Sequence, residues 1–116
     1  MDIKKEQRGD VIILHVAGRL DFGNAKAFQA SMESLFESAI DIASAIVIDC
    51  AALEYISSAG LRVFLICARL ASKSGLGLAV CNLTPLVKDV FDISGFDNIM
   101  AICGNQDAAL SAVSVK

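Results

Sequence analysis

The chain has 116 residues, of which 55% are hydrophobic and 20% are charged. This length and composition fit one globular domain, residues 1–116, and exclude a disordered segment. A formal net charge of −3, without a cluster of Lys and Arg, argues against a nucleic-acid interface. No apolar run approaches the roughly 18 residues of a membrane span and no leader peptide begins the chain, so we expect a cytoplasmic protein without membrane insertion.

The N-terminal third predicts a β-hairpin followed by a helix. Ile3–Gln7 and Val11–Gly18 are strand candidates separated by a Gly-Asp turn. Residues 25–40 then carry apolar side chains at helical spacing, and Asn24 is the expected N-cap of that helix.

The middle of the chain predicts a buried strand and a buried helix. Ala45–Cys50 is an apolar run, and a short polar link joins it to a helix that starts at Ser57 and Ser58. Apolar residues occupy most of that helix, which we expect to end at Gly75.

The C-terminal third alternates strands and helices. We expect a strand at Leu78–Cys81, a helix from Thr84 to Ile93, a strand at Ile99–Ile102 and a helix at Asn105–Val113. The element order is therefore ββαβαβαβα. Strands joined through helices must run parallel, so the predicted class is α/β, a single-domain mixed and mainly parallel β-sheet covered by about four helices.

The residue types do not assemble a catalytic or metal site. His15, the only histidine, lies in a strand pattern without a nucleophile or an acidic partner at relay spacing. The four cysteines are widely spaced within apolar stretches, without a C-x-x-C pair, and are expected to be core residues. We therefore expect no enzyme activity, no cofactor and no metal.

The adjacent serines at the third strand-to-helix junction have two possible roles. A serine at a helix start is usually an N-cap, and this is the ordinary role for Ser58. The same position also suits a phosphate, because helix N-termini favour negative charge. Gly60, in the first turn, permits close approach of another backbone or of a phosphate. The residues by themselves leave both roles of Ser58 open.

Three cations follow the serine pair along the same helix. Arg62, Arg69 and Lys73 are spaced by seven and four residues, so they form one basic stripe that begins within a turn of Ser58. Such a stripe is either a solvated helix face or an edge on which a partner docks.

Several separated motifs, in order, resemble one family. The stretch from Tyr55 to Leu61, YISSAGL, resembles the signature of the STAS family, the sulfate transporter and anti-sigma factor antagonist domain. Gly18–Asp21 resembles the end of the family's second strand, and Cys81–Pro85 with Val90–Phe96 resembles its third helix and the approach to the last strand.

The resemblance implies an anti-sigma factor antagonist in a bacterial partner-switching system that regulates transcription. Such a protein binds an anti-sigma factor that is also a serine protein kinase; the kinase phosphorylates one serine, and a metal-dependent serine phosphatase removes the phosphate. Ser58 matches the phosphoacceptor position, with Ser57 as a rival because it replaces a frequent aspartate. Asp21 and Asp49 match acidic positions near the acceptor. The implied partner-binding residues are Asp21, Asn24, Ser57, Ala59, Gly60, Leu61 and Arg62.

An alternative function uses the same helix without phosphorylation. In that case the chain is a STAS accessory subunit of a lipid-transport ATPase or of a larger signalling assembly. Neighbouring reading frames that encode a kinase-like ATPase or transporter components would discriminate between the two.

Overall fold

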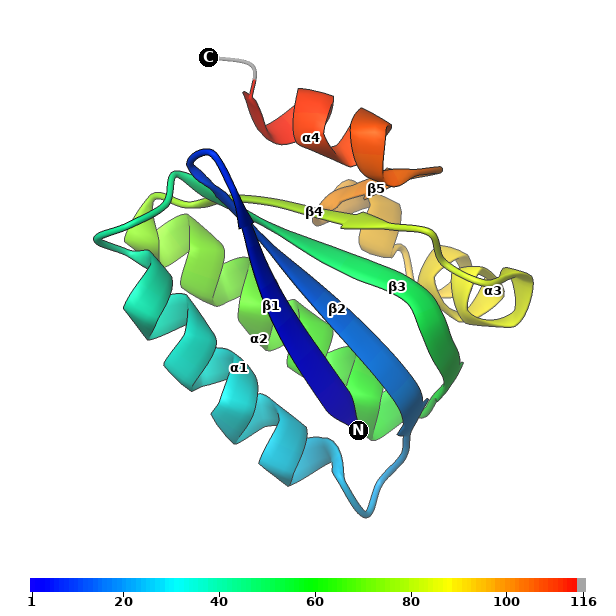
Figure 1. Ribbon diagram of the computed structural model, residues 1–116. Coiled ribbons are helices and arrows are strands. Elements are labelled where there is room, and N and C mark those ends of the chain that lie inside the picture. The colour runs from blue at the N-terminus through cyan, green and yellow to red at the C-terminus, as the bar shows by residue number, and fades with distance from the viewer. Residues whose placement is uncertain (115–116) are drawn as a thin grey trace.

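The computed structural model describes residues 1–114 as one mixed sheet with helices on both faces (Figure 1). The sheet order is β1-β2-β3-β4-β5. The strands are β1 (Asp2–Arg8), β2 (Val11–Leu20), β3 (Ala45–Ile56), β4 (Gly77–Cys81) and β5 (Ala101–Cys103). The helices are α1 (Ala25–Ala39), α2 (Ser58–Ser74), α3 (Pro85–Ile93), the 3-10 turn η1 (Phe96–Asn98) and α4 (Gln106–Ser114).

The predicted element order and fold class are confirmed. β1 and β2 pair antiparallel, whereas each later neighbour in the sheet pairs parallel. Gly9 has a φ of +64° in the hairpin turn, a conformation that glycine adopts without a steric penalty. The parallel strands need crossover connections, and the helices supply them.

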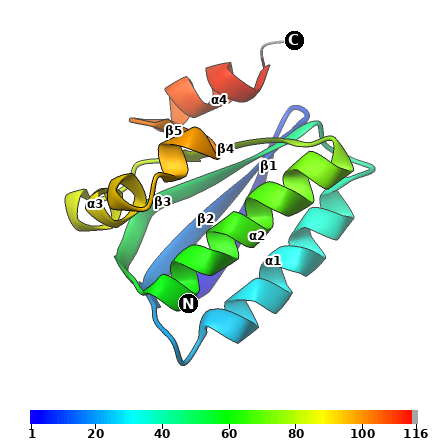
Figure 2. The ribbon, with the colours of Figure 1, turned by 180° about the vertical axis from the view of Figure 1, so that it is seen from behind.

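Alternation along the strands separates two apolar layers. Ile46 and Ile48 of β3 belong to the larger core beneath α1 and α2, whereas Ala45 and Val47 belong to a smaller core beneath α4. Figure 2 shows α1 and α2 side by side on one face of the sheet. On the opposite face α4 packs over β3, β4 and β5 (Figure 1). Val11 and Ile13 of β2 lie in the same apolar cluster as Ala109 and Val113 of α4.

The third and the last strand differ most from the prediction, and the other strands are one or two residues longer at an end than predicted. The third strand was expected to end at Cys50, but β3 continues to Ile56. The second half of β3 pairs with β2 alone, because the pairing with β4 stops at Asp49. Small or polar residues in this half interrupt the apolar pattern from which a strand would be predicted. The last strand was predicted at Ile99–Ile102 and lies at Ala101–Cys103, because Met100 still donates a backbone hydrogen bond to Phe96 of η1.

Candidate functional site

The site with the predicted phosphoacceptor lies where β2 and β3 end side by side. Leu20 and Ile56 are register partners at the ends of these parallel strands. The Ser57 N–H donates to the Leu20 carbonyl at 2.9 Å, which ties the start of α2 to the end of β2. The loop that follows β2 and the first turn of α2 therefore share one edge of the sheet, although more than thirty residues separate them in sequence.

The N-cap of α2 is Ser57, so the expectation that Ser58 caps the helix is wrong. Ser57 has an extended backbone, with φ −89° and ψ 171°, and its Oγ accepts a hydrogen bond from the Gly60 N–H at 3.1 Å. Ser58 is the first helical residue and its side chain is exposed. One serine thus holds the helix start, and the hydroxyl of the other is free for chemistry.

Gly60 permits close packing of α2 on β2. A Cβ at this position would lie 2.5 Å from Cγ and 2.8 Å from Cδ2 of Leu20, closer than real Cβ contacts. The predicted close approach at Gly60 is therefore with an apolar side chain of the sheet. This contact fixes the position of the first turn of α2, and hence of Ser58.

The loop between β2 and α1 is closed by a reciprocal pair of hydrogen bonds. The Asp21 N–H donates to Asn24 Oδ1 at 2.9 Å, and the Asn24 N–H donates to Asp21 Oδ1 at 3.1 Å. Asn24 Nδ2 also donates to the Arg19 carbonyl at 2.8 Å. Asn24 occupies the predicted N-cap position of α1, but its side chain makes no capping hydrogen bond and instead shapes the loop.

A groove of about 400 Å³ lies beside Ser58, between the first turns of α1 and α2. Its apolar lining comes from Phe22, Ala25, Ala59 and Val63, and its cations are Lys26 and Arg62. Phe22 is 86% exposed, in a loop where a phenylalanine has no packing role. Phe22 and Lys26 were not among the predicted partner-binding residues, although Asp21 and Asn24 beside them in the sequence were.

The predicted residues fall into an exposed set and a packing set. Ser58, Arg62 and Asp21 are exposed, whereas Gly60 and Leu61 are buried beneath them. Arg69 and Lys73 are also exposed, so the predicted basic stripe runs along the solvent side of α2. α2 has no acidic residue in its first turn. The positive end of its dipole is therefore not neutralised by a neighbouring carboxylate on the helix.

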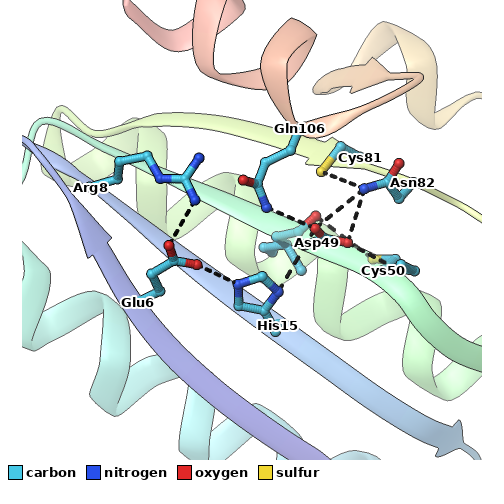
Figure 3. A network of polar contacts seen from close by, with 10 residues as sticks. Glu6, Arg8, His15, Asp49, Cys50, Cys81, Asn82 and Gln106 are labelled. Carbon is cyan, nitrogen blue, oxygen red and sulfur yellow. Dashed lines mark hydrogen bonds and ion pairs between the residues drawn. The ribbon is translucent and has the colours of Figure 1, made fainter.

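Asp49 lies in a different polar cluster, on the α4 face of the sheet (Figure 3). The prediction that it lies near Ser58 is wrong, since β3 runs on from Asp49 to Ile56, about 20 Å along the strand. Its carboxylate accepts from Asn82 Nδ2 at 3.3 Å, from Gln106 Nε2 at 3.0 Å and from the Ala51 N–H at 3.0 Å. Asp49 thus joins β3 to β4 and to the start of α4.

His15 continues this cluster across β2 (Figure 3). Its Nδ1 lies 3.8 Å from Asp49 Oδ2, and its Nε2 lies 2.8 Å from Glu6 Oε1. Arg8 donates to Glu6 at 2.8 Å. The hydrogen bond with His15, and then that with Arg8, lowers the pKa of the Glu6 carboxyl. The fold thus gives His15 two acidic neighbours, Glu6 and Asp49, that its spacing in the sequence did not indicate. Within residues 1–114 no hydrogen bond or ion pair joins His15 to a Ser, Thr or Cys side chain.

The thiols are packing groups. Cys50, Cys67 and Cys81 are buried as predicted, Cys103 is half-buried, and all four are unpaired. Burial raises the pKa of the Cys67 and Cys81 thiols to about 12, well away from the values of reactive cysteines. In the part of the chain that the structure describes, no three His, Cys, Asp or Glu side chains converge as a metal site would require.

Comparison with known proteins places this arrangement in one family. The STAS domain family model matches residues 2–109, and the chain belongs to the STAS domain family. BtrV of Bordetella bronchiseptica is 31% identical over 112 residues, covering 97% of this chain and 94% of BtrV. The anti-sigma F factor antagonist of Paenibacillus polymyxa is 29% identical over 115 residues, covering 99% of this chain and 97% of that protein.

Solved structures share the fold. An anti-sigma factor antagonist from Mycobacterium paratuberculosis superposes with a TM-score of 0.82 at 24% identity, covering 98% of this chain and 94% of that one. Phosphorylated SpoIIAA of Bacillus gives 0.67 at 18% identity, covering 92% and 96%. A chain of the stressosome, a signal integration and transduction hub, gives a TM-score of 0.69 at 21% identity, covering 96% of both chains. The curated relative from Paenibacillus and the solved structure from Mycobacterium are both named anti-sigma factor antagonists.

None of the helices within residues 1–114 has the length and apolar character needed to span a bilayer.

Proposed function

We propose that the protein is an anti-sigma factor antagonist switched by phosphorylation of Ser58. Unphosphorylated, it binds an anti-sigma factor that is also a serine protein kinase. The kinase ends that interaction by transferring a phosphate from ATP to Ser58, and a metal-dependent serine phosphatase restores the binding form. The loop Asp21–Asn24 and the first turn of α2 form the docking surface.

The observation that carries this proposal is the division of roles between the two serines. Because Ser57 caps α2, the Ser58 hydroxyl is exposed and makes no hydrogen bond within residues 1–114. A kinase can therefore modify Ser58 without breaking a bond that holds the helix. The positive end of the α2 dipole favours the resulting phosphate. A relative of the same fold exists in a phosphorylated form, which supports the same chemistry here.

The effect of the phosphate on binding follows from charge. A phosphate adds about −1.5 to −2 charges and three acceptor oxygens to a surface that was neutral at that position. Burying such a charge in an interface without an opposite charge beside it weakens the binding free energy by several kcal/mol. Because about 1.4 kcal/mol changes affinity tenfold, the complex dissociates without any change of fold.

Phosphopeptide mapping tests the phosphoacceptor. The protein is incubated with the kinase-like ATPase sought among the neighbouring reading frames (the adjacent ATPase), with Mg²⁺ and ATP, and digested for mass spectrometry. We expect phosphate on Ser58, its loss in Ser58→Ala and its retention in Ser57→Ala. Phosphate on Ser57 would assign the switch to the rival serine, and no phosphate on either would contradict switching.

Calorimetric binding to the same ATPase tests the consequence. Ser58→Ala should bind as the unmodified protein does, and Ser58→Glu should bind at least about tenfold more weakly. Equal affinities would contradict the switch. The second candidate is a non-phosphorylated STAS accessory subunit of a lipid-transport ATPase or of a larger signalling assembly. The similar fold in the stressosome structure favours the signalling assembly.

A further inference from the structure

The groove beside Ser58 has the composition of a binding pocket rather than of an ordinary surface. Four apolar side chains line it, and one of them, Phe22, has 86% of its surface exposed. Burying a phenylalanine side chain contributes about 1.5 to 3 kcal/mol, and interface energy concentrates in aromatic residues and arginine. Both residue types line this groove, and Arg62 lies one helical turn after the proposed phosphoacceptor.

The charged side chains that line the groove are both cations, and the carboxylate of Asp21 lies outside this lining. Lys26 and Arg62 flank it, no Asp or Glu lines it, and the chain as a whole has a net charge of −3. Neither cation forms an ion pair or a side-chain hydrogen bond with any residue of the described range 1–114. The nearest acidic residue in sequence, Asp21, already accepts the Asn24 N–H. The groove therefore complements an apolar side chain that has a carboxylate next to it.

Arg62 is also the cation best placed to reach a phosphate on Ser58. The two residues are four apart on α2, both are exposed, and side chains at this spacing face each other across one helical turn. Guanidinium groups bind phosphate and carboxylate oxygens with the same pair of N–H groups. Two anions thus compete for one arginine.

We propose that this groove receives an apolar side chain of the anti-sigma factor with a flanking carboxylate on Arg62, and that phosphate on Ser58 displaces this carboxylate by pairing with Arg62. The inference rests on the proposed function and gives it a mechanism. Phosphorylation then both adds charge to the docking surface and withdraws the cation that recognises the partner.

Phosphorus NMR tests the phosphate contact without a kinase. Phosphoserine is installed at position 58 during translation, and the second pKa of the phosphate is measured in the otherwise unmodified protein, in Arg62→Gln and in Arg69→Gln. All three samples carry the phosphoserine. An ion pair between Arg62 and the phosphate should make the second pKa of the phosphate about 0.3 lower in the protein with both arginines, and in Arg69→Gln, than in Arg62→Gln. Equal values in all three would overturn the pairing.

Amide NMR of the unphosphorylated protein tests the groove. The probes are two blocked tetrapeptides, Glu-Leu-Leu-Glu and Gln-Leu-Leu-Gln, which differ only in charge. The Glu peptide should shift the signals of Gly23, Ala59 and Arg62 and bind at least about threefold more tightly than the Gln peptide. Arg62→Gln and phosphoserine at position 58 should each remove that difference. Equal binding of the two peptides, shifts elsewhere or no binding would overturn the groove assignment.

The two levels of the proposal fail separately. If the adjacent ATPase leaves Ser58 unmodified, the proposed function fails, yet the phosphorus and amide measurements still report on Arg62. If Ser58 is modified but Arg62 contacts neither anion, the function stands and this mechanism falls.

Discussion

The Oγ of Ser57 accepts the Gly60 N–H at 3.1 Å and so performs the capping that its neighbour Ser58 does not. Removing an N-cap serine costs about 1 kcal/mol of folding free energy. We expect Ser57→Ala to lower the free energy of unfolding by about that amount, measured by urea denaturation. Ser58→Ala is the matched control and should change it by less than about 0.5 kcal/mol. Equal losses would mean that both hydroxyls support the helix.

Gly60→Ala tests the close packing of α2 on β2. The added Cβ would overlap Leu20, and such overpacking lowers the free energy of unfolding by about 1 to 3 kcal/mol. The better helix propensity of alanine offsets about 1 kcal/mol of that loss. We expect a net loss of about 1 kcal/mol in the free energy of unfolding. Gly104→Ala is the control, because a Cβ there meets no atom within 4 Å, and it should be nearly neutral. A neutral Gly60→Ala would show that Leu20 moves aside at little cost.

Most of the fold could be predicted from apolar periodicity, because strands such as Ala45–Cys50 and the helix after Ser58 bury a regular pattern. The second half of β3 could not, since it pairs on one side only and its open residues look like a loop. The serine pair was also visible in sequence, but which serine caps α2 depends on the backbone angles of Ser57. Phe22 joins the site only because β2 and β3 end together.

Asp49→Asn should destabilise the protein although the side chain keeps its size. Asn82 and Gln106 both donate N–H groups to the Asp49 carboxylate, and an amide there would point its own donor at one of them. An unsatisfied polar group of this kind costs about 1 to 3 kcal/mol. Asp92→Asn, which alters the exposed ion pair with Lys88, is the control and should cost less than about 1 kcal/mol in the same denaturation experiment. Similar small changes for both would show that the Asp49 network is solvated.

The buried Cys67 thiol should make stability fall at alkaline pH. Burial raises the pKa of this thiol to about 12, above its ordinary value of 9.0, so the folded protein keeps a proton that the unfolded chain loses as the pH rises past 9.0. The stabilising contribution is present below that pH and declines above it, by about 1 to 2 kcal/mol between pH 8 and pH 10.5. Unfolding of Cys67→Ala, measured over the same range, should lack this component. Identical pH profiles would show that Cys67 ionises equally in both states.

Phe22→Ser should separate binding from stability. Phe22 is 86% exposed, so its removal should change the free energy of unfolding by less than about 0.5 kcal/mol. If the ATPase covers Phe22 when it binds at the groove, the affinity of Phe22→Ser for that ATPase, measured by calorimetry, should fall at least about tenfold. Ile93→Ser on α3 is the matched control, because Ile93 is 87% exposed but does not line the groove. An equal loss of affinity in both variants would extend the docking surface onto α3, and no loss in Phe22→Ser would remove the groove from it.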